Sequence, residues 1–281
     1  MSDARLDVGI VGAGRVATAL AAALADPSAN CDVLVWARRP AAAAAAVAGA
    51  AVTEDLARVA ARPTILVAVS DDAIDDVAAE LAAHLAAGAS SVVMHTSGAS
   101  TGADAMPALR EHPNVVRGSL HPLVAVPEGA GRDVLQGGDH VVEAERPEGV
   151  ERAAEIVRRV GGRLLRLPDS DAPTKARYHA LATMVATGVV ALVDRAASEL
   201  GDDAESRSAF RAAFGRLAAT GATNVQADAG ARVLTGPIAR GDETTLQRHD
   251  DVLRATSAED LYRAVRRAVE QMVDEAEGPG A

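Results

Sequence analysis

Short apolar runs rich in β-branched residues alternate with alanine-rich helical segments over the first 170 residues of the chain. Such alternation is typical of βαβ units, in which helices cover both faces of a mainly parallel, doubly wound sheet. The runs expected to form strands are 6–11, 33–36, 64–69, 92–96, 115–120 and 140–143.

The pattern changes after Leu167. From 172 to 276 the apolar residues recur at helical spacing, interrupted by turn signals at Gly201 and at 235–241. We therefore expect an α/β domain over 1–169, followed by an all-α domain over 170–281.

Three further stretches complete this interpretation. The alanine tract 41–50 is predicted to be helical, because alanine is the best helix former. The apolar stretch 180–193 suits a buried core helix and is too short to span a membrane. The tail after Glu277 is expected to fray.

Composition narrows the range of partners. A net charge of −11 with no clustered basic face argues against nucleic acid and against an anionic membrane surface. Only 2% of the residues are aromatic, too few for base-stacking platforms. The lone Cys31 allows no internal disulfide, and the seven histidines lack metal-ligand spacing. Without a signal peptide at the start, we expect a cytoplasmic protein that carries no metal.

A glycine-rich turn directly follows the first predicted strand and opens a helix. It has the G-x-G-x-x-A spacing of a dinucleotide-binding turn. In such turns the first glycine permits the tight bend, and the second lets the backbone approach a pyrophosphate bound at the helix N-terminus. The candidate cofactor-binding residues in this turn are Gly12, Ala13, Gly14, Arg15 and Val16.

The end of the second predicted strand favours NADP over NAD. An NAD site would place a carboxylate there to hold the ribose hydroxyls, whereas this strand is followed by Arg38 and Arg39. Either guanidinium could pair with a 2′-phosphate. The alternative is that both arginines are solvated loop charges. Trp36 is expected in the core rather than against an adenine.

Polar side chains follow three other predicted strands. Val69, Ser70 and Asp71 are expected to line the nicotinamide side. Asp71 or Asp72 could equally cap the next helix, and the two uses are compatible. His95-Thr-Ser97-Gly98 and Ser119-Leu-His121-Pro122 end two more strands, which suggests substrate contacts from Ser97, Gly98 and His121. The alternative for each histidine is a satisfied structural residue.

The chain has a single lysine, Lys175, among 28 basic residues. If Pro173 lies in the first turn of a helix, then Lys175 and His179 are four residues apart on one face. A desolvated lysine can protonate an alkoxide formed by hydride transfer, whereas arginine cannot give up its proton. Lys175 is therefore the candidate general acid, and His179 would orient the amine or the substrate. One alternative is that the composition depletes lysine throughout the chain, so that Lys175 remains by accident. The alternative for His179 is a position on the helix surface.

Several of these motifs together resemble one family, the Rossmann-like proteins that carry the domain of unknown function 2520. This family is related to pyrroline-5-carboxylate reductases, to ketopantoate reductases and to the 6-phosphogluconate and β-hydroxyacid dehydrogenase group. The stretches that carry the resemblance are 12–16, 69–74, 95–98, 118–122, 175–180 and 234–242.

The resemblance implies a Rossmann domain followed by a helical domain like the C-terminal domain of 6-phosphogluconate dehydrogenase. Lys175 matches the proton-donating lysine of the family's K-x-x-x-N pattern, and His179 replaces its asparagine. Thr187 would take over part of a polar role on the same helix. Arg240 would clamp a substrate carboxylate before a helix capped by Asp242, with a plain capped turn as the alternative. The helical domains of these relatives interlock into a homodimer.

The sequence thus predicts an NADPH-dependent reductase of a small 2-oxo acid, with ketopantoate as the best single candidate substrate. One alternative is an imine reductase of the pyrroline-5-carboxylate type, in which the basic imine nitrogen needs less help from a protein acid. Another is a sensor or scaffold that binds NADP without turnover.

Overall fold

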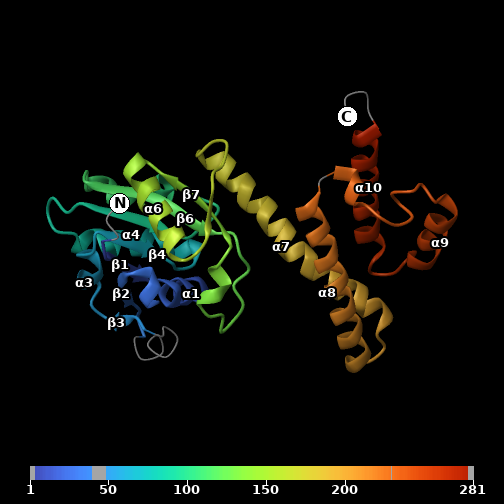
Figure 1. Ribbon diagram of the computed structural model, residues 1–281, viewed down its shortest axis with the longest axis horizontal. Coiled ribbons are helices and arrows are strands. Elements are labelled where there is room, and N and C mark those ends of the chain that lie inside the picture. The colour runs from blue at the N-terminus through green and yellow to red at the C-terminus, as the bar shows by residue number, and fades with distance from the viewer. Residues whose placement is uncertain (1–3, 40–48, 229, 278–281) are drawn as a thin grey trace. The chain divides into compact units, whose positions relative to one another are not determined.

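The computed structural model describes residues 4–39, 49–228 and 230–277 (Figure 1). The chain forms two compact units, Met1–Ala182 and Thr183–Ala281, and each is described here by itself. The predicted helix over 41–50 lies almost entirely outside the described residues, as does the tail after Glu277.

The first unit is built on an eight-stranded sheet with the order β3-β2-β1-β4-β5-β6-β7-β8. All neighbouring strands are parallel except β6 and β7. The first six strands in this order repeat the doubly wound arrangement expected from the sequence. The strands are β1 Leu6–Val11, β2 Cys31–Trp36, β3 Ala51–Thr53, β4 Thr64–Val67, β5 Ser91–His95, β6 Val115–Pro122, β7 Asp139–Ala144 and β8 Arg163–Leu165.

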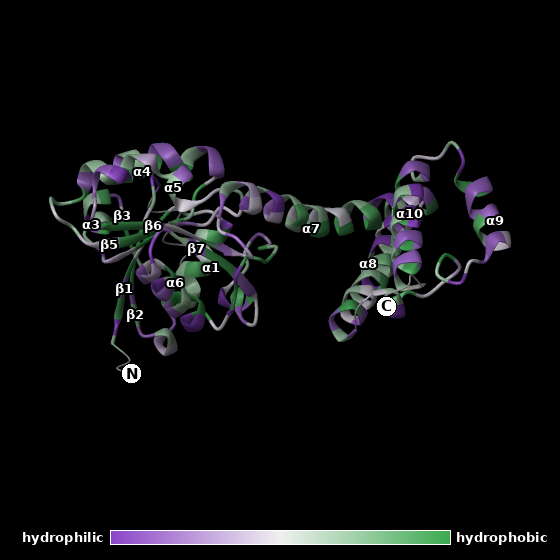
Figure 2. Cartoon of the chain, turned by 90° about the horizontal axis from the view of Figure 1, so that it is seen from above, coloured by the Kyte–Doolittle hydropathy of each residue, from purple (hydrophilic) through white to green (hydrophobic). Residues whose placement is uncertain are grey.

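Helices cover both faces of this sheet, and each face has its own apolar core. One core joins the sheet to α1 and α6 through residues such as Leu20 and Ile156, and the other joins it to α3 and α4 through Leu56 and Leu81. Figure 2 shows the two helical layers on opposite sides of the sheet. The helices are α1 Arg15–Leu24, α3 Leu56–Ala60, α4 Ile74–His84, α5 Gly102–Ala105 and α6 Pro147–Arg159.

The rest of the described chain is helical. It contains α7 Ala172–Leu200, α8 Ala204–Ala227, α9 Glu243–Leu253 and α10 Glu259–Glu277. The predicted α/β domain followed by an all-α region is confirmed. The helical region starts close to the predicted boundary at 169/170, but the two compact units divide within α7, so its first turns belong with the sheet.

The apolar stretch 180–193 is helical as predicted, but one chain does not bury it. Met184, Val185 and Val190 are each more than 60% exposed. By length and composition alone, α7 could cross a membrane, and only 6% of its most apolar window is buried. The expectation of a core helix within one chain is wrong, because helical periodicity reports an apolar segment without reporting what covers it.

Candidate active site

The glycine turn after β1 has the geometry that a dinucleotide requires. Gly12 has a φ of 124°, and a Cβ there would lie 2.3 Å from the carbonyl oxygen of Ala68. A Cβ on Gly14 would have nothing within 4 Å. Gly14 is also the N-cap of α1, no side chain caps the helix, and its first turn has no acidic residue. These features fit a pyrophosphate, because backbone N–H groups at an uncapped helix N-terminus attract anions.

The other predicted cofactor residues flank this turn. Val69 lies against Gly12, since its Cγ1 would be 3.3 Å from a Cβ at that glycine. Arg38 and Arg39 are exposed directly beyond β2, where a dinucleotide fold places the adenosine ribose. Trp36 is 8% exposed and its Nε1 donates to the carbonyl of Glu54, so its predicted core position is confirmed.

At the ends of β4 and β5, two of the predicted polar residues meet. The hydroxyl of Ser97 donates to Asp71 over 2.8 Å and accepts from the amide of Ala99. Ser70, rather than Asp71 or Asp72, is the N-cap of the short 3-10 helix that follows β4. The capping alternative for the two aspartates is therefore wrong, and Asp71 is left at the sheet edge as an exposed hydrogen-bond acceptor.

His95, just before Ser97, lies in the interior, but it is not the satisfied structural residue of the alternative, because its Nε2 has no hydrogen-bond partner among the described residues. It is fully buried and its Nδ1 accepts from the amide of Ser97 over 3.1 Å. Burial lowers the pKa of His95 to about 4, so this imidazole is neutral near pH 7.

A cluster of aromatic rings stands where β6 ends and α7 begins. The Nδ1 of His121 is 2.7 Å from the hydroxyl of Tyr178. His179 lies edge-on to His121, with ring centroids 5.6 Å apart. A Cβ on Gly98 would lie 2.7 Å from His179 Cδ2 and 3.0 Å from His121, so a larger residue at this position would displace the two rings. The three ring-bearing residues are partly exposed.

Two pKa values in this cluster are displaced by burial. Burial, with smaller contributions from His179 and Lys175, lowers the pKa of His121 to about 4. Burial raises the pKa of Tyr178 to about 12. Near pH 7 the pair therefore consists of a neutral imidazole and a protonated phenol. Tyr178 was not among the predicted site residues, although it lies next to His179 in sequence.

Lys175 has a different environment from the one expected. Asp171 caps α7 by accepting from the amide of Thr174. One residue on, the Lys175 side chain turns into the interior, where it is 0% exposed and Nζ donates to Ser119 over 2.6 Å. Its amine does not reach solvent in this structure, although it stands four residues before the partly exposed His179. Its role as general acid stays a prediction.

The buried amine belongs to a polar network that also includes a carboxylate. The hydroxyl of Ser119 is 3.3 Å from Glu143 Oε2, and the same oxygen accepts from the amide of Gly102 over 2.9 Å. Burial lowers the pKa of Lys175 to about 8, against the opposing effect of Glu143. Burial likewise raises the pKa of Glu143. Ser119 and Glu143 are direct partners across the antiparallel β6–β7 ladder, which the sequence did not predict.

Three predicted substrate residues belong to the second unit. The hydroxyl of Thr187 donates to the carbonyl of Thr183 in its own helix. Asp242 caps α9 by accepting from the amide of Thr245, as predicted. Arg240 is exposed in the preceding turn. Substrate contacts from Thr187, Arg240 and Asp242 stay predictions.

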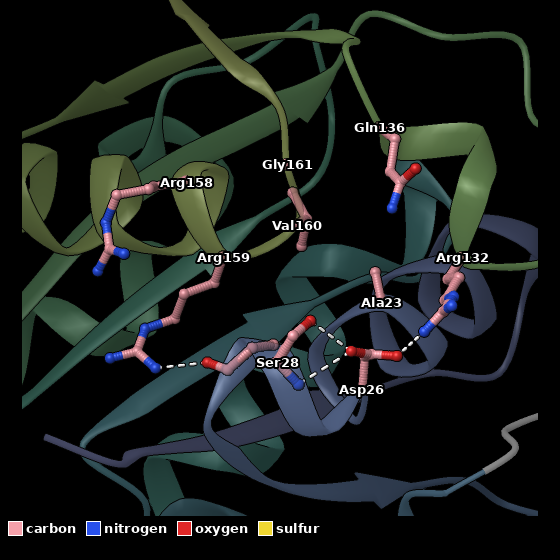
Figure 3. Close-up of a pocket in the computed structure, with 10 residues that line it drawn as sticks. Ala23, Asp26, Ser28, Arg132, Gln136, Arg158, Arg159, Val160 and Gly161 are labelled. Atoms are coloured by element: carbon pink, nitrogen blue, oxygen red, sulfur yellow. Dashed lines mark hydrogen bonds and ion pairs between the residues drawn. The ribbon is translucent and has the colours of Figure 1, made fainter. Parts of the chain in front are cut away.

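A cavity of about 380 Å³ lies elsewhere in the first unit, and none of the predicted site residues lines it (Figure 3). Four of the polar side chains that line it, Asp26, Ser28, Arg132 and Arg159, are bonded to each other or to the backbone. Arg132 pairs with Asp26, and Arg159 donates to the carbonyls of Ala29 and Asn30. We therefore interpret these residues as structural contacts between the ends of α1 and α6, and not as a ligand site. Within the described ranges, no three His, Cys, Asp or Glu side chains are grouped so that they could hold a metal ion.

Comparisons with known proteins agree with this architecture. No curated protein matches the sequence. A solved structure of a candidate NADP oxidoreductase from Bacteroides fragilis is 21% identical, with a TM-score of 0.73 over 96% of this chain and 100% of that one. A Thermotoga maritima protein is 19% identical, with a TM-score of 0.67 over 96% and 100%. Pyrroline carboxylate reductase of Plasmodium falciparum, solved with NADP bound, is 14% identical, with a TM-score of 0.57 over 95% and 99%. At these identities the likeness shows the fold.

Two family descriptions together account for most of the chain. Residues 1–122 match the Rossmann-like domain, and residues 140–269 match the domain of unknown function DUF2520. The resemblance inferred from the motifs is therefore confirmed, and the chain belongs to the proteins that join a Rossmann-like domain to a DUF2520 domain.

Proposed function

We propose that this protein is an NADPH-dependent reductase of a small 2-oxo acid, with ketopantoate as the first candidate. The observation that carries the proposal is the uncapped N-terminus of α1, beside an open space at Gly14, at the same sheet edge as a polar cluster. Neighbouring strands lie about 4.8 Å apart, so the end of β6 is about 14 Å from the turn after β1. A bound dinucleotide can cover that distance, and its nicotinamide would then lie towards Asp71 and His121.

The cofactor would supply a hydride, and the chain would bind and orient the reactants. The N-terminus of α1 would hold the pyrophosphate, and Arg38 or Arg39 the 2′-phosphate. Arg38→Asp should then weaken NADPH binding and leave NADH binding nearly unchanged, as measured by the fluorescence of the bound nicotinamide. Equal losses for both cofactors would contradict the 2′-phosphate assignment.

The decisive experiment is NADPH oxidation by the purified protein with a panel of 2-oxo acids and cyclic imines. Turnover with a 2-oxo acid supports the proposal, and turnover with cyclic imines alone supports the imine reductase instead. Binding of NADPH without any turnover would favour the sensor or scaffold.

The sequence assigns the proton to Lys175, and the structure sets a condition on that assignment. The amine would have to exchange its hydrogen bond to Ser119 for one to the substrate oxygen. Lys175→Ala should lower kcat by more than about tenfold if the amine is the acid. A smaller loss would remove Lys175 from the chemical step and leave the reductase proposal standing.

We also propose that a second copy of the chain covers the exposed apolar side of α7. Leu181, Val185 and Val189 recur at four-residue spacing along the helix, and each is at least 45% exposed. Light scattering should find a dimer, and Val185→Glu should give monomers. A monomeric wild type, or one that needs detergent to stay dispersed, would contradict this proposal.

A further inference from the structure

We propose that the hydroxyl of Tyr178 donates the proton to the substrate oxygen and that His121 then reprotonates the phenolate. This inference rests on the proposed reductase function and assigns its proton donor. It starts from the 2.7 Å contact between the phenol and the Nδ1 of His121, at the point where β6 meets the first turns of α7.

Accessibility distinguishes Tyr178 from Lys175. A proton donor has to approach the reacting oxygen to within hydrogen-bond distance. Lys175 is fully buried and its partner Ser119 is buried as well, so neither reaches solvent in this structure. Tyr178 is partly exposed, as are both neighbouring histidines. Of these polar groups, the phenol is the proton donor that a substrate can meet without rearrangement of the interior.

The protonation states also fit the task. Burial raises the pKa of Tyr178 to about 12, so the phenol carries its proton throughout the neutral range. An aliphatic alcohol is a weaker acid than a phenol, so proton transfer from the phenol to an alkoxide is favourable. His121 is neutral near pH 7 and can hold one proton on either ring nitrogen.

A bound NADPH would supply the hydride that forms a C–H bond at the carbonyl carbon while the C=O π-bond breaks. The hydroxyl of Tyr178 would give its proton to the carbonyl oxygen. The Nδ1–H of His121 then returns a proton to the phenolate, and its Nε2 takes one from solvent. The net change is NADPH, one proton and a ketone giving NADP⁺ and an alcohol.

The ring of His121 is held for this role by its surroundings. His179 stands edge-on to it at 5.6 Å, Tyr178 does so at 5.7 Å, and Gly98 leaves room for both imidazoles. A relay needs this fixed geometry because proton transfer depends steeply on distance and alignment. His179 is in this account a positioning residue, which explains why a ring can stand where relatives have an amide.

The chain supplies its own control. It has only two tyrosines, and the second, Tyr262, makes the same kind of contact with His249. The phenol–imidazole distance there is 2.9 Å, and the ring centroids are 5.7 Å apart at 79°, as in the first pair. Tyr262 belongs to the second unit, so Tyr262→Phe removes an equivalent hydroxyl that is not part of the His121 cluster.

The test compares Tyr178→Phe with Tyr262→Phe in NADPH oxidation, on the 2-oxo acid that the wild type turns over. Tyr178→Phe should lower kcat about 100-fold, with KM and the NADPH dissociation constant nearly unchanged, whereas Tyr262→Phe should retain wild-type kcat. A loss of less than about tenfold in Tyr178→Phe, or an equal loss in both variants, overturns the assignment.

A second variant covers the case in which Tyr178→Phe does not fold, as judged by NADPH binding. His121→Gln keeps the phenol but removes the relay, and kcat should fall by at least about tenfold. Unchanged turnover would overturn the role of His121 and, with it, the proposed pair. Failure of the reductase function looks different, because the wild type itself would then reduce no 2-oxo acid.

Discussion

The free energy of unfolding of the first unit should increase as the pH rises above neutrality, because the buried amine of Lys175 then loses its proton in the folded protein. Burial lowers the pKa of this amine from 10.5 to about 8 in the folded protein, whereas unfolding restores the ordinary value. Between these two values the unfolded chain binds more protons than the folded chain, so the free energy of unfolding increases with pH. Lys175→Met removes the titrating group and this contribution with it.

The size of the effect follows from the displacement of the pKa. Each pH unit within the interval contributes about 1.4 kcal/mol, so the whole interval could contribute about 3.5 kcal/mol at most. From about pH 7.5 to about pH 9.5, the wild type should gain about 2 kcal/mol relative to Lys175→Met. Cys31 and the tyrosines also titrate at alkaline pH with raised pKa values, but they are common to both proteins and cancel in the difference.

Urea unfolding followed by the emission of Trp36 measures this difference. Trp36 is the only tryptophan, lies in β2 of the same unit and is 8% exposed, so its emission reports the unfolding of that unit. The same measurement on both proteins in a Glu143→Gln background removes any change in the protonation of Glu143 that follows the loss of the ammonium. A difference that stays constant across the pH range in both backgrounds would refute the reasoning.

Three further substitutions test separate parts of the structure. Gly98→Ala puts a methyl group 2.7 Å from His179 Cδ2 and should lower kcat in NADPH oxidation, whereas unchanged turnover would show that the ring cluster is dispensable. Arg159→Met removes a guanidinium that donates to three backbone carbonyls. The free energy of unfolding, measured in urea, should fall by about 3 kcal/mol. A loss below about 1 kcal/mol would contradict the structural interpretation of the cavity. Asp242→Ala removes the cap at Thr245 and should destabilise α9 by about 1 kcal/mol, measured by hydrogen exchange in that helix, where unchanged protection would contradict it.

The layered fold could be predicted because its central strands are continuous apolar runs. The predicted strand 6–11 and the observed β1 coincide, and the others differ by a few residues at their ends. Ala51–Thr53 and Arg163–Leu165 are not predicted, since three residues show no periodicity and both strands lie at the edges of the sheet. The reversal of β7 leaves no signal in local sequence, because pairing direction depends on how the chain returns to the sheet.

The candidate site could be predicted only where local backbone geometry defines it. Gly12 is recognisable because the tight turn between strand and helix needs glycine there, and Gly14 is recognisable by its spacing, with open space where a Cβ would lie. The burial of Lys175 depends on which way one turn of α7 faces, and its neighbour Glu143 comes from the antiparallel strand. Tyr178 could have been singled out by one signal, the scarcity of aromatic residues in this chain.

Because the only lysine is buried, the folded protein presents no lysine ε-amino group to acylating or cross-linking reagents. Reaction at Lys175 would then require the first turns of α7 to separate from β6. The rate at which an amine-directed label accumulates on that one side chain would therefore measure how often this junction opens under native conditions.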